Sequence, residues 1–225
     1  MEKKVTVIIR NYNQGAFIGK AIDSALNQVL PSHLYEILVI DDGSTDGSPD
    51  ILETYRNKIG VITQQHKGAI PALNSGIANA RGEYIILLDA DDTFEPEILS
   101  QMFNILERER GVSFVYCDYY EKDIETDEAK VFSLKDNIFN SVAVGIMFRK
   151  GILEEAGGYD ESLIFPEYDL LIKVMKKYKG KYIPRPLFTR YRHKDSITAD
   201  TDKVRAGMQQ LYDRYGKIKG LRDYR

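Results

Sequence analysis

Several features that would place a chain in a special class are scarce or absent. Cys117 is the only cysteine, so an internal disulfide is impossible and a reducing compartment is favoured. Positive charge is not in excess, because 31 lysine and arginine residues oppose 34 aspartate and glutamate residues, a formal net charge of −3. We therefore expect no nucleic-acid partner. Apolar runs are short, such as residues 84–88, whereas a membrane-spanning helix needs about 20 residues.

Motifs of several enzyme classes are missing as well. Residues 15–21 resemble a phosphate-binding loop but have one spacer residue too few, and the chain has no Gly-x-Ser-x-Gly or Gly-x-Gly-x-x-Gly. His33, His66 and His193 have no cysteine or histidine at metal-ligand spacing, so zinc is not expected. Residues 1–4 lead straight into an apolar segment, so we expect no secretion signal and a cytoplasmic location.

The first half of the chain alternates apolar strands with amphipathic helices. Residues 5–9, 37–40 and 84–88 are short, continuous and rich in β-branched side chains, as in strands buried on both faces of a parallel sheet. A helix capped by Ser48, with Pro49 at its first position, should follow the second of these strands. Further helices are expected over residues 15–28, over 70–80 and from near 96, and further strands over 61–63 and 112–116. This alternation predicts an α/β fold with a mostly parallel central sheet flanked by helices.

The pattern loosens after residue 118. Residues 121–130 are charged and typical of a turn, and 141–149 favour a strand. A helix is expected over 170–175, and two short strands over 182–183 and 189–192. The composition, with 43% hydrophobic and 29% charged residues, is that of one globular domain, and no linker or repeat divides the chain.

Polar residues follow three of the expected strands. They are the sets 10–13, 41–44 and 89–92, which bring at least five carboxylates toward one edge of the sheet. In open parallel sheets ligands bind at this edge, and the repulsion between carboxylates calls for a cation. Oxygen ligands from a short acidic loop suit Mg²⁺ or Mn²⁺. Taken singly, each set could also be an ordinary polar turn.

The same segments carry a resemblance to a known family. The sequence reads VIIRNYN at 7–13, VIDDGSTD at 39–46, NSGI at 74–77, GEYIILLDADD at 82–92, GGYD at 157–160 and YDL at 168–170. In this order and spacing the chain resembles a family 2 glycosyltransferase with the GT-A fold, over residues 5–198. The resemblance implies a single Rossmann-like domain and inverting transfer of a sugar from a nucleoside-diphosphate donor, with uridine diphosphate as the default.

The resemblance also implies roles for individual residues. Tyr12 should stack on the base, Asp42 should hydrogen-bond it, Asp89 should lie near the ribose, and Asp91 should hold the metal. His193 resembles a late residue that reaches the metal or the phosphates in some relatives. Three cations complete the expected donor site, namely Arg10, Lys67 and Arg192; Lys67 would replace an arginine that many relatives carry where this chain has Leu73.

The base that takes the proton from the acceptor hydroxyl is left open between two residues. The family usually places an aspartate where this chain has Glu167, and Asp169 follows two residues later. Both could instead only begin a helix and favour its positive end. This departure keeps open a non-catalytic protein that binds sugar nucleotides. A nucleotidyltransferase is disfavoured, because no glycine-rich basic loop follows the first strand.

The carboxyl-terminal segment is locally basic. Residues 203–225 hold seven lysine and arginine residues against two aspartates, interleaved with Leu211, Tyr212, Tyr215 and Leu221. Such a segment could be a solvated helix, or could contact an anionic membrane near a lipid-linked or polymeric glycan acceptor. We therefore expect a donor-binding half over 1–118, an acceptor and catalytic half over 119–199, and a basic helix over 200–225.

Overall fold

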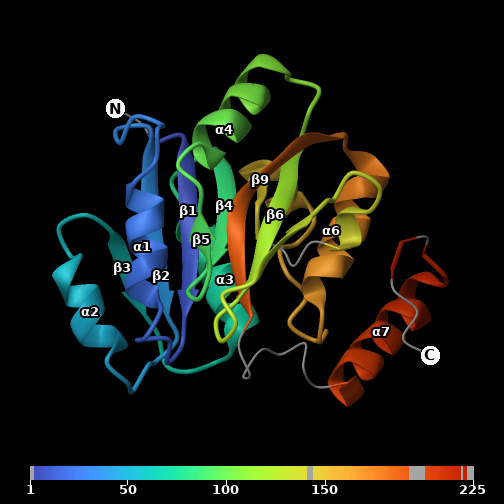
Figure 1. Ribbon diagram of the computed structural model, residues 1–225. Coiled ribbons are helices and arrows are strands. Elements are labelled where there is room, and N and C mark those ends of the chain that lie inside the picture. Colours follow the sequence, from blue (N-terminus) through green and yellow to red (C-terminus); the bar gives the residue numbers. More distant parts are fainter. Residues whose placement is uncertain (1–2, 141–143, 193–200, 219, 222–225) are drawn as a thin grey trace.

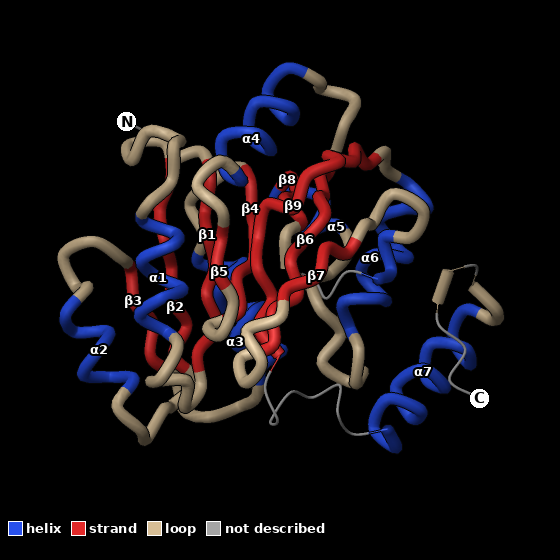
Figure 2. The backbone as a smooth tube through the Cα atoms, in the orientation of Figure 1, coloured by secondary structure: helices blue, strands red, loops and turns tan. Residues whose placement is uncertain are grey.

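A computed structural model describes residues 3–140, 144–192, 201–218 and 220–221. One sheet runs through the molecule, with strand order β3-β2-β1-β4-β8-β6-β9-β5 and β7 paired to β6 (Figures 1 and 2). The strands are β1 Val5–Asn11, β2 Tyr35–Asp41, β3 Gly60–Thr63, β4 Tyr84–Asp89, β5 Thr93–Phe94, β6 Phe114–Asp123, β7 Ala129–Phe132, β8 Ile146–Arg149 and β9 Gly180–Arg192. The helices are α1 Ile18–Leu26, α2 Ser48–Thr54, α3 Ala69–Asn79, α4 Ile98–Arg108, α5 Lys150–Glu155, α6 Pro166–Lys177 and α7 Thr201–Tyr215, with a short 3₁₀ turn at Ile138–Asn140.

The first four strands of the chain, β1 to β4, are all parallel to one another. β1 lies between β2 and β4, and β3 pairs with the outer side of β2. Successive side chains of β1 enter opposite layers: Val7 and Ile9 pack with α1 and α4, whereas Ile8 packs with α3. Burial on both faces explains the continuous apolar runs of these strands. The α/β class and the parallel half of the sheet are thus confirmed.

The second half of the sheet is mixed. β8 is antiparallel to both β4 and β6, and β9 returns parallel to β6. The charged stretch expected to be a turn instead extends β6 to Asp123 and begins β7, so only the residues between them turn. The two short strands expected near the end of the sheet are one strand, β9. The apolar sequence pattern of this strand is interrupted at Pro184 and Pro186, where the register of β9 against β6 shifts.

The start of α2 also differs from the expectation. Ser48 is the first residue of the helix rather than its cap, and its hydroxyl is buried without a hydrogen-bond partner. The carboxylate of Asp46 accepts the Ser48 N–H at 2.9 Å instead, and its other oxygen accepts the Gly15 N–H at 2.8 Å. Asp46 therefore ties the beginning of α2 to the loop that precedes α1.

A close backbone approach fixes the entry to β4. Gly82 donates its N–H to Thr6 Oγ1 at 2.9 Å, and a Cβ atom at Gly82 would lie 2.6 Å from the Thr6 nitrogen. Only glycine fits such an approach without a backbone shift. The Arg81-Gly82 end of the preceding helical segment therefore determines how β4 is placed beside β1.

The helix α7 packs on α6 through an apolar seam at the edge of the molecule (Figure 1). Its buried residues Val204, Met208 and Leu211 meet Phe165 and Ile172 in this seam. The apolar side chains that could have entered a membrane are thus used within the fold. Among the described residues, no helix has both the length and the hydropathy required to cross a bilayer.

Candidate active site

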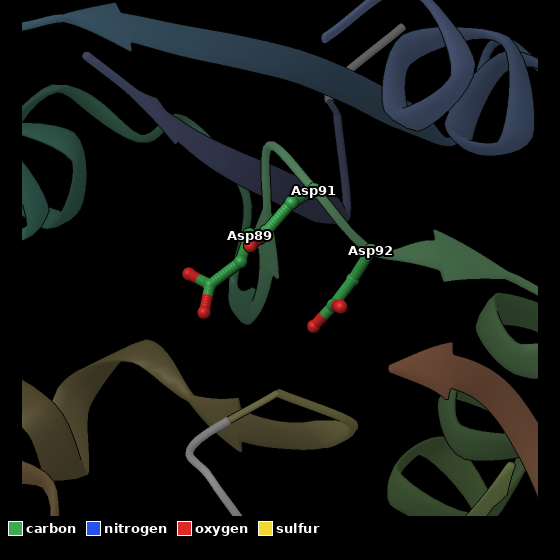
Figure 3. Close-up of side chains that lie close together, drawn as sticks. All are labelled: Asp89, Asp91 and Asp92. Atoms are coloured by element: carbon green, nitrogen blue, oxygen red, sulfur yellow. The ribbon is translucent and has the colours of Figure 1, made fainter. Parts of the chain in front are cut away.

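An acidic loop follows β4 at the carboxyl end of the parallel strands. Asp89, Asp91 and Asp92 each bring a carboxylate oxygen within 4.8 Å of the others (Figure 3). Asp92 is buried, whereas Asp89 and Asp91 are partly exposed. Three hard oxygen donors at this spacing fit a divalent cation that completes its coordination with water and phosphate oxygens. Asp92 adds a carboxylate that had no separate role in the sequence interpretation.

Asp89 is also part of an ion pair with Arg10. The two residues are register partners on the adjacent strands β1 and β4. Arg10 donates from Nε to Asp89 Oδ1 at 2.7 Å and from Nη2 to Asp89 Oδ2 at 3.0 Å. Burial would lower the pKa of Arg10, but the charge and hydrogen bonds of Asp89 raise it above its usual value. Both oxygens of Asp89 thus receive charge-assisted hydrogen bonds from Arg10, so part of the acceptor capacity of this carboxylate is already in use.

Asp92 is held in place by the far end of the chain. Its Oδ1 accepts the backbone N–H of Tyr191 at 3.0 Å, and β5, which begins one residue later, pairs with β9. Burial raises the pKa of Asp92 well above its usual value, and the negative charges of Asp89 and Asp91 raise it further. A carboxylate in this environment is stabilised in its ionised form by a bound cation. The donor set therefore fits Mg²⁺ or Mn²⁺.

The carboxylates that follow β2 do not join this cluster. Asp41 accepts Nδ2 of Asn11 at 2.8 Å and the hydroxyl of Ser44, so it holds the loops after β1 and β2 together. Asp41 ends β2 at the same edge of the sheet as Asp89, as expected, but local donors rather than a cation hold its carboxylate. The sequence could not distinguish the two groups, since both follow a buried strand and contain adjacent aspartates.

Asp42 organises the loop that leads into α3. Its carboxylate accepts Nε2 of Gln64 at 2.7 Å and the backbone N–H groups of Lys67 and Gly68 at 3.0 and 2.7 Å. His66 Nδ1 lies 2.8 Å from its second oxygen. Burial would raise the pKa of Asp42, but these hydrogen bonds lower it below its usual value. Asp42 is thus an ionised anchor whose acceptor positions are already in use.

Tyr12 presents an aromatic surface beside this anchor. Its ring is 42% exposed and stacks on His66, with ring centroids 3.9 Å apart and an interplanar angle of 18°. Because His66 is also held by Asp42, the stacked pair has a fixed orientation. Sequence reasoning assigned no role to His66, since only the folded loop brings it against Tyr12.

Glu167 lies in the first turn of α6, close enough to Arg10 and Asp89 for their charges to act on it. It lines a small recess with Tyr159 and Leu170, and the charges of Arg10 and Asp89 act on its carboxylate. Burial raises the pKa of Glu167 to about 7, although its own backbone N–H and Arg10 oppose the rise. A carboxylate with a pKa near 7 is suited to accept a proton at neutral pH.

Asp169 points into a different environment. Its side chain is fully buried and accepts Nη1 of Arg214 at 2.9 Å and the hydroxyl of Tyr215, both from α7. Lys173 Nζ lies 2.7 Å from its other oxygen. The two residues between which the sequence left the base open are therefore on opposite sides of the first turn of α6.

The motif at residues 74–77 has a structural contact with the loop before α6. The side-chain amide of Asn74 accepts the Tyr159 N–H at 2.9 Å and donates to the Tyr159 carbonyl at 2.9 Å. The GGYD segment is thereby fixed to α3. This contact places the recess of Glu167 relative to the parallel strands.

The remaining predicted donor ligands are spread along the edge of the site. Lys67 is exposed, and its backbone N–H bonds Asp42. Arg192, at the end of β9, is 62% exposed and pairs with Glu121 at 3.5 Å. His193 lies outside the described residues. The structure therefore brings Arg10, Asp89 and Glu167 together, and holds Arg192 in a separate pair on β6 and β9.

Solved structures identify the architecture around this site. The chain matches S. aureus TarS 1–349 in complex with UDP-GlcNAc with a TM-score of 0.72 and 18% identity, covering 98% of this chain and 68% of that one. It matches the mannosyltransferase PcManGT from Pyrobaculum calidifontis, in complex with GDP-Man and Mn²⁺, with a TM-score of 0.72 and 20% identity, covering 95% and 64%. The fold is thus that of the GT-A glycosyltransferases.

Sequence comparison gives the family. Residues 6–157 match the family described as Glycosyl transferase family 2, and the chain belongs to it. An uncharacterized glycosyltransferase of Rickettsia typhi is 30% identical over 220 residues, 88% of this chain and 66% of the relative. The poly(ribitol-phosphate) beta-glucosyltransferase of Bacillus spizizenii is 38% identical over 106 residues, 45% of this chain and 17% of the relative. The chain thus spans only part of each relative. The resemblance stated from the motifs is confirmed.

Proposed function

We propose that this chain catalyses inverting transfer of a sugar from a nucleoside-diphosphate-sugar to a hydroxyl acceptor in glycan synthesis. The observation that carries the proposal is the placement of Glu167. Its carboxylate has a pKa of about 7, and the charges of the paired Arg10 and Asp89, beside the acidic loop, act on it. A base at this position can serve an acceptor that approaches from α6 while the donor lies along the carboxyl ends of the strands.

The reaction at Glu167 is a single displacement. Its carboxylate takes the proton from the acceptor hydroxyl as that oxygen forms a bond to the anomeric carbon. The bond from the anomeric carbon to the diphosphate oxygen breaks, and the nucleoside diphosphate leaves with the electron pair. Attack opposite the leaving group inverts the configuration. Arg10 orients Asp89 and moderates the charge around the base.

A divalent cation, Mg²⁺ or Mn²⁺, would be held by Asp91 and Asp92, with Asp89 beside them. When bound, it would stabilise the negative charge that grows on the leaving diphosphate. The contacts of Asp92 support this assignment, because burial and two neighbouring carboxylates disfavour its ionised form until a cation is present. The complex of PcManGT with Mn²⁺ is consistent with such a cation.

The nucleoside would occupy the surface formed by Tyr12 and the loop that Asp42 holds. The exposed face of Tyr12 is suited to stack on a base, with His66 supporting the opposite face. Asp42 would contact the base only if one of its present donors gave way, so its main contribution is to fix Lys67 and its neighbours. The complex of TarS with UDP-GlcNAc supports a UDP-sugar as the first donor to test.

We extend the proposal to the division of the chain and to its location. Residues 1–118 would bind the donor, 119–199 would supply the acceptor side, and 200–225 would form a basic edge. Because the apolar face of α7 is buried, any contact with an anionic membrane at the cytoplasmic face would depend on exposed lysines such as Lys203 and Lys217. Failure to co-sediment with anionic vesicles at low salt would remove this part of the proposal.

Thermal unfolding with a panel of nucleoside diphosphates tests the donor site. Each nucleotide is added with and without Mn²⁺ or Mg²⁺ to wild type, Asp91→Ala and the control Asp50→Ala, whose residue lies on α2. A ligand at about 100 times its Kd should stabilise the wild type and the control by about 2.7 kcal/mol, and only with metal. The Asp91→Ala protein should lose this metal-dependent stabilisation.

Two outcomes would contradict the proposal. If no nucleotide stabilises the wild type with either metal, the acidic loop is not a donor site in this chain. If a nucleotide binds but no sugar is transferred from any donor to any hydroxyl acceptor, the chain is a non-catalytic sugar-nucleotide binder. Product formation that disappears in Glu167→Gln while donor binding persists would establish the enzyme.

A further inference from the structure

The buried carboxylate of Asp169 connects α7 to the first turn of α6. It accepts Nη1 of Arg214 and the hydroxyl of Tyr215, and Lys173 completes its surroundings. Arg214 also donates to Asp160 at 2.7 Å, in the loop that leads to α6. Burial and the hydrogen bond to Asp169 raise the pKa of Tyr215 to about 12. Removing α7 would leave a buried negative charge with one cation, which is strongly unfavourable.

A second contact between the two helices lies on the other side of Glu167. A Cβ atom at Gly207, in the middle of α7, would lie 2.4 Å from Phe165 Cδ2, so the helix backbone approaches this ring closely. Phe165 immediately precedes α6 and belongs to the same apolar seam as Met208. The residues two positions before and two positions after Glu167 are therefore both held by α7.

We propose that α7 positions the Glu167 carboxylate for proton transfer, with Arg214 and Tyr215 acting through Asp169 and with Gly207 acting through Phe165. This inference rests on the proposed function. Arg214 and Tyr215 are positioning residues in it, because their hydrogen bonds are to Asp169 and Asp160 rather than to the acidic loop. The base would thus depend on a helix that lies beyond the family-matched residues 6–157.

The groups that act directly on Glu167 come from other elements. They are Arg10 on β1, Asp89 on β4 and Tyr159 in the loop before α6. Substitution in α7 leaves all three unchanged. A change at Glu167 in such a variant is therefore transmitted through the backbone of the first turn of α6 or through the charge of Asp169.

The test compares Arg214→Met, Tyr215→Phe and the conservative Arg214→Lys with the control Arg205→Met. Arg205 lies on the same helix in an exposed pair with Asp202 at 3.7 Å. We expect Arg214→Met to lower kcat about tenfold or more while donor Kd and the number of donor sites per chain stay unchanged. Tyr215→Phe should have a smaller effect, Arg214→Lys should recover part of kcat, and Arg205→Met should match wild type.

The pH profile of kcat distinguishes a positioning role of Arg214 from a merely structural one. Its acid limb is the range in which kcat falls as Glu167 gains a proton. Loss of the Arg214 cation leaves Asp169 less compensated, so the limb should move up by about half a pH unit. A limb that stays in place, or a kcat within twofold of wild type at full donor binding, would overturn the inference.

A measurement without turnover keeps the inference separate from the proposed function. A ¹³C NMR titration of the Glu167 carboxyl, assigned with Glu167→Gln, reports on this residue even if the wild type transfers no sugar. A shifted titration in Arg214→Met but not in Arg205→Met supports the link from α7 to Glu167. Identical titrations in all three proteins would refute it, whatever becomes of the activity.

Discussion

Substituting the two carboxylates in the first turn of α6 should separate activity from stability, because Glu167→Gln should mainly lower activity and Asp169→Asn should mainly lower stability. Glu167→Gln removes the proposed base while keeping the shape of the side chain. Asp169→Asn removes the charge that Arg214, Tyr215 and Lys173 surround. The pair is well matched, because both residues are acidic and lie two positions apart on one helix.

The magnitudes follow from the surroundings of each group. Loss of a general base should lower kcat by about 10²–10⁴-fold in Glu167→Gln. Folding raises the pKa of Glu167 from 4.5 to about 7. The contribution of this group to the free energy of unfolding is therefore fully present below pH 4.5 and is lost as the pH rises through 7. Glutamine mimics the protonated form, so Glu167→Gln should be more stable than wild type at pH 8, by about 1–3 kcal/mol.

Asp169→Asn should behave in the reverse way. Breaking one side of a buried ion pair costs about 3 kcal/mol, which corresponds to a fall in melting temperature of about 6–12 °C for a chain of this size. Donor affinity should be kept, because Asp169 is separated from the acidic loop. Its residual kcat should exceed that of Glu167→Gln.

The assay combines melting curves at pH 4 and pH 8 with a pH profile of kcat/KM. Below pH 7 the wild-type kcat/KM should rise about tenfold per pH unit and then level off, as Glu167 loses its proton. Full activity in Glu167→Gln would refute the role of this residue as the base. A kcat/KM profile that levels off near pH 4.5 instead of pH 7 would refute it as well. The assignment would equally fail if Asp169→Asn were the inactive, normally stable variant.

Three further substitutions test other parts of the structure. Gly82→Ala should destabilise the protein by about 2 kcal/mol, because the added Cβ clashes with the Thr6 backbone, whereas the control Gly111→Ala has open space and should not. Equal melting temperatures of the two variants would contradict the close approach of Gly82 to β1. Tyr12→Ala should weaken nucleotide binding by about 1–3 kcal/mol in calorimetry and Tyr12→Phe should not, so an unchanged Kd in both would exclude stacking there. Asn74→Ala should lower the melting temperature because it loses three hydrogen bonds, two with the Tyr159 backbone and one with Glu161, and a normal melting curve would argue against these contacts.

The parallel half of the fold was predictable because one signal dominated it. Strands buried on both faces require continuous apolar runs, and the helices between them show a clear apolar stripe. The acidic loop after β4 could be found for the same reason, since it directly follows such a run. The second half was less predictable. Pro184 and Pro186 lie at a register shift within β9, and the local sequence pattern cannot distinguish such a shift from the end of a strand.

The candidate site was harder to predict from the sequence than the fold, because the role of each site residue depends on partners that are far away in the chain. Asp41 and Asp91 have similar local sequences, and the contacts of Asp41 with Asn11 and Ser44 come only with the folded loops. The partners that occupy Asp169 come from α7, which begins more than 30 residues later. The place of His66 against Tyr12 is likewise a product of the folded loop.

The hydrogen bond from Tyr191 to Asp92 joins residues 99 positions apart. During synthesis at about 5–20 residues per second, the acidic loop is made about 5–20 seconds before the strand that holds it. A nascent chain that ends before β9 therefore carries all three aspartates without their final arrangement. The final position of the Asp92 carboxylate is therefore reached only after β9 has been made.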